Sequence, residues 1–142
     1  MESKQFGGQY VVRLDKGEEV IASLKQFCLA RGISSAWVMG IGAVSRATIG
    51  FFDLASREYR PLELTTDHEI TNLMGDISIL EGEVFPHLHA TLSGVDGQVR
   101  GGHLFSAVIN ATGEIILGPL EGILERKYFA ESGLIRLALE DT

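Results

Sequence analysis

The sequence predicts an α+β domain built on a mainly antiparallel sheet. Three observations support this fold class. One stretch has the apolar periodicity of a helix, several others have the composition of short strands, and the segments between the strands are too short for crossover helices. With 142 residues the chain has the length of one domain. We therefore expect residues 1–142 to form a single domain with few helices.

The first predicted elements are a strand at residues 9–14 and a helix from Glu18 to Arg31, separated by a turn at 15–17. Two acidic residues in the first helical turn favour its N-terminus, and Gly32 is placed to end it. The apolar positions of the helix follow the i, i+3, i+4, i+7 pattern. They are Val20, Ile21, Leu24, Phe27 and Cys28.

The other predicted elements are strands rich in β-branched and aromatic residues, each bounded by Gly, Asp or Ser. They cover residues 36–39, 47–52, 59–64 and 69–80. Gly40-Ile41-Gly42 stands between two of them, where a phosphate-binding loop would place its glycines. No helix is predicted to open there, so we do not expect a nucleotide site. Residues 120–139 mix an apolar run with charged and turn residues, and the sequence does not predict their secondary structure.

Composition narrows the classes of partner. Lys and Arg number 12 against 19 Asp and Glu, and the formal net charge of −7 repels phosphate backbones and anionic membranes. We therefore expect no direct nucleic-acid binding and no membrane association. The single cysteine has no intramolecular partner and lies on the predicted helix face, which is typical of a buried thiol in a reducing compartment. The N-terminal residues lack the pattern of a signal peptide, and we expect a cytoplasmic protein.

Three of the four histidines stand close together in the sequence and predict a metal site. His87 and His89 project to the same face of a strand, with Cα atoms about 6.5–7 Å apart, from where two imidazoles can reach one ion. His103 follows after a turn signal. The fourth histidine, His68, stands between Asp67 and Glu69 in a polar stretch and is predicted to be a surface residue.

The turn between these histidines decides whether they share a face. A three-residue loop at Val95–Gly97 sets His89 directly opposite His103 on the neighbouring strand. A two-residue loop at Asp96-Gly97 sends His103 to the other face, unless a β-bulge at Gly101-Gly102 restores it. Either route produces one face with three histidines.

Three neutral imidazoles with an open fourth position suit Zn²⁺, and they also suit Ni²⁺, Co²⁺ or Fe²⁺. The sequence does not choose among these metals. We predict His87, His89 and His103 as the ligands, with water or a small anion at the fourth position. A metalloenzyme would also need a general base near the metal-bound water. The candidate carboxylates are Glu69, Asp76, Glu81 and Glu83.

Two rival interpretations of the histidine segment are disfavoured. A cupin also carries His-x-His on a strand, but its motif continues to a glutamate where this chain has Ser93-Gly94. A serine hydrolase needs its nucleophile on a strained elbow before a helix, and Ser93 lies in a predicted strand or turn.

With these residues in view, the chain resembles the plants and prokaryotes conserved (PPC) domain along nearly its whole length. The central segment HLHATLSGVDGQVRGGHL, residues 87–104, is the most specific part of the match. The other matching segments are Gly40-Ile41-Gly42-Ala43-Val44 and Asn72-Leu73-Met74-Gly75-Asp76-Ile77-Ser78. The resemblance implies an α+β fold with a curved antiparallel sheet, a homotrimer, and a metal site at the three clustered histidines.

The leading functional hypothesis is therefore a metal-binding, trimeric, cytoplasmic protein whose biochemical role the sequence does not specify. A first alternative is a metalloenzyme that acts on a small molecule through a metal-bound water. A second is an interaction module or an accessory to a DNA-binding partner. Plant members of the family contact DNA through AT-hooks, and this chain has no Arg-Gly-Arg-Pro motif.

Overall fold

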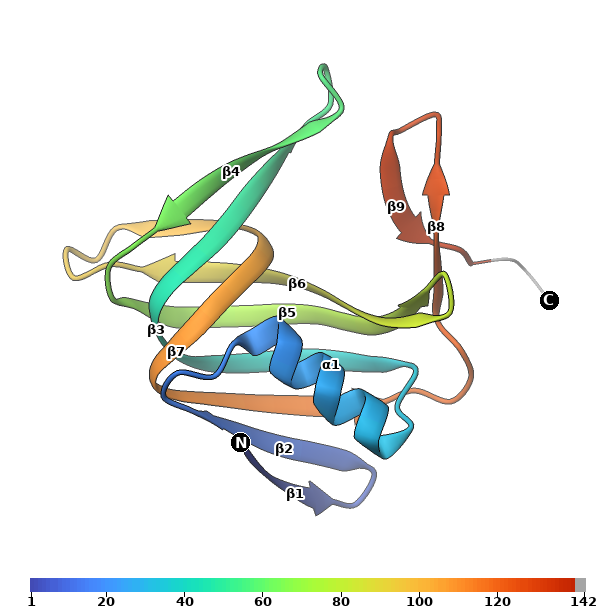
Figure 1. Ribbon diagram of the computed structural model, residues 1–142, viewed down its shortest axis with the longest axis horizontal. Coiled ribbons are helices and arrows are strands. Elements are labelled where there is room, and N and C mark those ends of the chain that lie inside the picture. The colour runs from blue at the N-terminus through green and yellow to red at the C-terminus, as the bar shows by residue number, and fades with distance from the viewer. Residues whose placement is uncertain (140–142) are drawn as a thin grey trace.

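A nine-stranded sheet with a helix against one face forms the protein (Figure 1). The computed structural model describes residues 1–139. Its elements are β1 (Glu2–Phe6), β2 (Gln9–Asp15), α1 (Val20–Arg31), β3 (Ala36–Asp53), β4 (Glu58–Leu64), β5 (His68–Leu80), β6 (Glu83–Ser93), β7 (Val99–Pro119), β8 (Glu125–Phe129) and β9 (Leu134–Leu137). The prediction of one domain over 1–142 includes residues 140–142, which lie outside the described residues.

The helix follows the predicted pattern, with a small shift at its start. Glu19 is the N-cap, and its side chain accepts a hydrogen bond of 2.6 Å from the backbone N–H of Ala22. Gly32 ends the helix in the left-handed conformation, with φ of 65°. The buried face packs against β6 and β7. Among the described residues, no helix is long and apolar enough to cross a membrane.

Strand β3 joins two segments that the sequence predicts as separate strands. It runs without interruption through Gly40 and Gly42, where its pairing with β5 and β7 shifts register. A Cβ atom on Gly42 would lie 2.5 Å from the carbonyl oxygen of Thr112 on β7. These glycines therefore permit bulges and close strand packing. They lie within a strand and do not open a helix.

Four long strands pair in a closed ring. β3 pairs with β5, β5 with β6, β6 with β7, and β7 with β3, all antiparallel. The bulges bend β3 and β7 so that each takes part in more than one pairing along its length. The predicted α+β class with a curved, mainly antiparallel sheet is confirmed.

The C-terminal segment, which the sequence does not assign, is a hairpin of β8 and β9. β8 adds to β5 through a short parallel pairing at Ile79 and Leu80. Figure 1 shows this hairpin and the β3–β4 hairpin rising on the same side of the sheet. The two hairpins flank the region above β6.

The helix and the sheet enclose one cluster of buried apolar side chains, which includes the single cysteine. Cys28 is fully buried, and burial raises the pKa of its thiol to about 12. A thiol in this environment stays protonated and packs as a small apolar group. The prediction of a buried free cysteine is confirmed.

His68 is not the surface residue that the sequence predicts. Its exposed fraction is 7%, and its Nδ1 lies 2.7 Å from the carbonyl oxygen of Thr66. The flanking Asp67 and Glu69 are exposed because successive residues of a strand face opposite sides. Their polarity suggested a solvated stretch, but the alternation places His68 on the inner side together with Ile70.

Candidate metal centre

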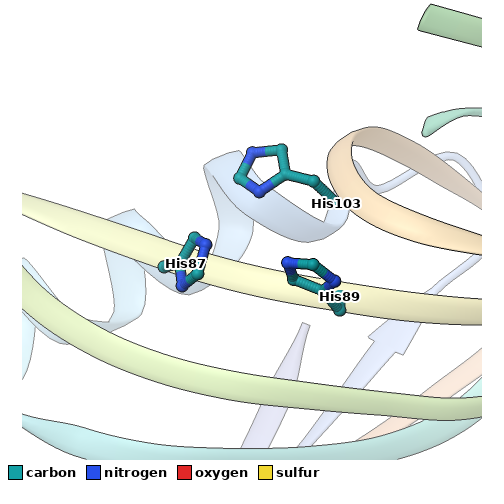
Figure 2. A group of neighbouring side chains, drawn as sticks. All are labelled: His87, His89 and His103. Atoms are coloured by element: carbon teal, nitrogen blue, oxygen red, sulfur yellow. The ribbon is translucent and has the colours of Figure 1, made fainter. Parts of the chain in front are cut away.

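Three imidazole rings from two neighbouring strands converge on one point (Figure 2). His87 and His89 come from β6, and His103 comes from β7. One ring nitrogen from each residue lies within 4.8 Å of those of the other two. The ring centroids are 5.1 to 5.6 Å apart. Side chains from two paired strands therefore offer three nitrogen donors to one small volume.

The turn between β6 and β7 brings the rings together as the three-residue loop predicts. The backbone N–H of Gly94 donates to the oxygen of Gln98 at 3.0 Å, which closes the hairpin around Val95–Gly97. Gly97 has a φ of 73°, in the left-handed region that this loop requires. His89 is consequently the direct cross-strand partner of His103.

No bulge is needed in this hairpin, and Gly102 has a different role. The pairing of β6 with β7 runs in unbroken register from Ser93 to His89. A Cβ atom on Gly102 would lie 2.6 Å from the carbonyl oxygen of Gly50 on β3. Gly102 therefore lets β7 approach β3 closely at the point where His103 enters the site.

The surroundings of the site favour the neutral imidazole of two of its histidines, His89 and His103. Burial, together with the charges of His87, His89 and Arg126, lowers the pKa of His103 to about 4. Burial and the charge of His87 also lower the pKa of His89. The neutral imidazole is the form that coordinates metals. His89 and His103 are therefore held in the metal-binding form at pH 7.

The residues present fit a metal ion. Nδ1 of His103 is buried and makes no hydrogen bond among the described residues. A buried polar atom without a partner is costly, and most such atoms in folded proteins are satisfied. A set of three histidine nitrogens matches the preference of Zn²⁺ and its neighbours in the first transition series. Bound metal would supply these nitrogens with a positive partner.

A partly buried ion pair of Arg126 and Asp76 lies beside His87. Nη2 of Arg126 lies 2.6 Å from Oδ2 of Asp76 and 2.9 Å from Nδ1 of His87. Nε of Arg126 donates to the hydroxyl of Ser78 at 2.8 Å. Burial raises the pKa of Asp76, but its interactions with His87, Arg126 and Ser78 outweigh that effect and leave the pKa below its ordinary value. Asp76 is therefore an ionised carboxylate beside a candidate ligand.

The contacts of His87 with Asp76 and Arg126 depend on which ring nitrogen of His87 carries the proton. Oδ2 of Asp76 lies 3.7 Å from Nδ1 of His87. When Nδ1 carries the proton, the carboxylate is placed to attract it, and Nε2 is left as the metal-binding nitrogen. When Nδ1 is unprotonated, it accepts a hydrogen bond from Arg126.

An aromatic pocket of about 350 Å³ adjoins the site, with His87 and His103 in its lining. The ring of His103 packs against Tyr59 and Phe105, at centroid distances of 5.1 and 4.7 Å. The pocket lies between the β3–β4 hairpin and the β8–β9 hairpin, since both contribute residues to it.

Of the four carboxylates considered as general bases, Asp76 lies beside a site histidine. Glu69 and Glu81 are exposed, and Glu83 forms a surface ion pair with Lys25.

Sequence reasoning missed Arg126 and the aromatic lining. Arg126 stands between exposed residues in a segment with no clear pattern, and the strand alternation there is a signal that would have placed it inward.

Comparisons with known proteins agree with this structure. A solved protein from Bacteroides thetaiotaomicron, described as a candidate DNA-binding protein, is 32% identical with a TM-score of 0.92, and 96% of each chain is covered. The metal-containing protein AF0104 from Archaeoglobus fulgidus is 35% identical with a TM-score of 0.87, covering 95% of this chain and 96% of that one. A plant- and prokaryote-conserved protein from Pyrococcus horikoshii is 29% identical with a TM-score of 0.86, covering 99% and 96%.

A curated relative, the bifunctional protein GlmU of a Synechococcus strain, is 29% identical over 113 residues. That match covers 76% of this chain but 16% of the relative's length. The family model of the Plants and Prokaryotes Conserved domain, abbreviated PCC or PPC, matches residues 1–121. With the fold, the histidine geometry and this match together, the chain belongs to the plants and prokaryotes conserved domain family.

Proposed function

We propose that this protein binds one divalent transition-metal ion, with Zn²⁺ as the first candidate, through His87, His89 and His103. The observation that carries the proposal is the convergence of three ring nitrogens within 4.8 Å. The similar protein from Archaeoglobus fulgidus is described as metal-containing, which supports the same reading. A bound ion would polarise whatever occupies its fourth position.

The metal content of untagged protein tests this proposal. We expect close to one metal per chain by atomic absorption after incubation with Zn²⁺ and removal of the excess. His87→Ala and His103→Ala should each lose the ion, because two imidazoles hold it far less tightly than three. Full occupancy in both variants would contradict the assignment.

We also propose that the chain forms the homotrimer that its family resemblance implies, in the cytoplasm. Support comes from apolar side chains that stand exposed on neighbouring strands: Met39 and Met74 are direct cross-strand partners, and Ile41 lies two residues further along β3. Such a patch favours burial against another chain. Light scattering at the mass of three chains is the expected result, and a monomer would contradict it.

Direct DNA binding is not part of the proposed function, although a similar protein carries that description. The net charge of −7 offers few phosphate contacts. We predict no retardation of a duplex in a gel-shift assay at physiological salt and micromolar protein. Sub-micromolar binding under those conditions would favour the alternative of a nucleic-acid accessory.

A further inference from the structure

The hollow beside the histidines has the composition of a ligand site. Five aromatic rings line it, together with aliphatic side chains of β9. The rings are those of Phe52, Tyr59, Phe85, Phe105 and Tyr128. Its volume of about 350 Å³ is at the small end of the range of small-molecule sites. The shape and lining therefore favour a small ligand with an apolar body.

The one charged side chain in the described lining of the hollow is a cation, in contrast to the acidic chain as a whole. Its lining contains Arg57 and two site histidines, and none of the described residues that line it is acidic. The carboxylate of Asp76, which lies beside His87, is already paired with Arg126. Because the three imidazole ligands are neutral, a bound divalent ion would keep its full charge of +2. An anionic group on the ligand is therefore favoured at the histidine end.

Arg57 holds the two walls of the hollow together. Its guanidinium donates to the carbonyl oxygens of Ala130 and Glu131, at 3.2 and 3.4 Å. Its aliphatic stem packs against Gly133, where a Cβ atom would lie 3.2 Å from the stem. The tips of the β3–β4 and β8–β9 hairpins are thus joined, and the hollow has fixed walls.

We propose that this hollow binds small monocarboxylic acids with an aromatic or branched apolar body, with the carboxylate directed toward the histidine cluster. The inference rests on the proposed metal site, because the bound ion supplies most of the attraction for the anionic end. The aromatic rings hold the apolar body through burial and ring stacking. The hairpin β8–β9, which supplies part of the wall, lies beyond the segment matched by the family model.

The full chain loaded with Co²⁺ provides the test, because the visible absorption of Co²⁺ reports on its ligands. The probes are sodium benzoate, sodium acetate and benzyl alcohol. We expect benzoate to change the spectrum at concentrations at least about tenfold below those that acetate requires, since its ring is buried. Benzyl alcohol, which has the ring without the charge, should leave the spectrum unchanged.

Matched variants locate the binding. Ile135→Trp fills the hollow, and it should abolish the advantage of benzoate over acetate while Co²⁺ uptake stays complete. Ile123→Trp is the control, because Ile123 is also an exposed isoleucine but lies outside the lining of the hollow. Tyr128→Ala removes an exposed ring of the wall and should reduce the same advantage severalfold without adding bulk.

Each outcome has a separate meaning. Absence of Co²⁺ bands in the wild-type protein would overturn the proposed metal site and this inference with it. Normal Co²⁺ bands with equal responses to benzoate and acetate would overturn the inference alone. A benzoate response in Ile135→Trp equal to that of Ile123→Trp would also overturn it. A change in the number of associated chains in Ile135→Trp, measured by light scattering, would show that a second copy occupies the hollow and would overturn it too.

Discussion

His68 is buried and His103 is half-buried, and their Nδ1 atoms have different surroundings. Nδ1 of His68 is 2.7 Å from the carbonyl oxygen of Thr66, its neighbour in sequence. Nδ1 of His103 is buried without a partner, and two further imidazoles face the same ring. Burial by itself does not mark a metal ligand. A metal ligand is indicated by a ring nitrogen that has no hydrogen-bond partner and lies close to other possible ligand atoms.

The same contrast separates the two regions of the sheet. A backbone carbonyl oxygen hydrogen-bonds to Nδ1 of His68, so the role of this residue is structural. Around His103 the backbone places the imidazole, through the loop at Val95–Gly97 and the close approach of Gly102, but leaves its nitrogen free. A ligand is therefore expected near His103, where a buried nitrogen has no hydrogen-bond partner among the described residues.

The largest effect should come from removing one histidine from each region. Saturating zinc, at about one hundred times its dissociation constant, should stabilise the wild-type protein by about 2.7 kcal/mol in urea unfolding. His103→Ala should lose this gain, and His68→Ala should keep it.

His68→Ala should instead lower the stability of the metal-free protein by about 1–3 kcal/mol, because the buried imidazole and its hydrogen bond to the carbonyl oxygen of Thr66 are lost. If zinc stabilised His103→Ala as much as the wild type, the contrast between the two histidines would be unfounded.

A smaller effect should follow from changing the carboxylate next to each histidine. Asp76→Asn should weaken zinc binding by about 10- to 100-fold, since the carboxylate that orients His87 is lost. Asp67→Asn is the matched control, because Asp67 is exposed beside His68. Competition with a chromophoric chelator measures both affinities, after circular dichroism shows that both variants are folded. Equal affinities for the two variants would mean that Asp76 does not position His87.

The placement of the site histidines could be predicted from local rules alone. Strand alternation puts His87 and His89 on one face, and the geometry of a three-residue hairpin loop puts His103 opposite His89. Both rules act over a few residues, and no tertiary contact overrides them here. The helix at Val20–Arg31 was predictable for the same reason, since its pattern and its glycine cap are local.

The parts that escaped prediction depend on contacts between distant segments. Arg126 reaches Asp76 across fifty residues of sequence, and its burial depends on how β8 joins β5. The aromatic hollow is lined by two hairpins that are far apart in the sequence, and the local sequence of neither hairpin predicts that they pack together. Strand β3 looked like two strands because its glycines suggest a break, whereas the close approach of β7 keeps it continuous.

The smallest of the expected effects concerns acid, and it involves the metal-free protein. The pKa of His103 in the folded protein is about 4, against about 6.5 for a free imidazole. Between these values the unfolded chain binds a proton that the folded chain does not, so stability falls as the pH falls from about 6.5 to about 4. Above pH 6.5 both states are neutral, and this residue contributes no dependence on pH.

His103→Gln should therefore lose less stability than the wild type over that interval, by about 1–2 kcal/mol, because glutamine has no proton to gain. This is less than the full difference in pKa implies, since solvent reaches part of the ring and screens its interactions. Urea unfolding of both proteins in the presence of a chelator, at pH values from 7 to 4, measures the difference. Parallel curves over the whole interval would show that His103 is not held neutral by its burial. Its unpaired nitrogen would then be no sign of a site prepared for a metal.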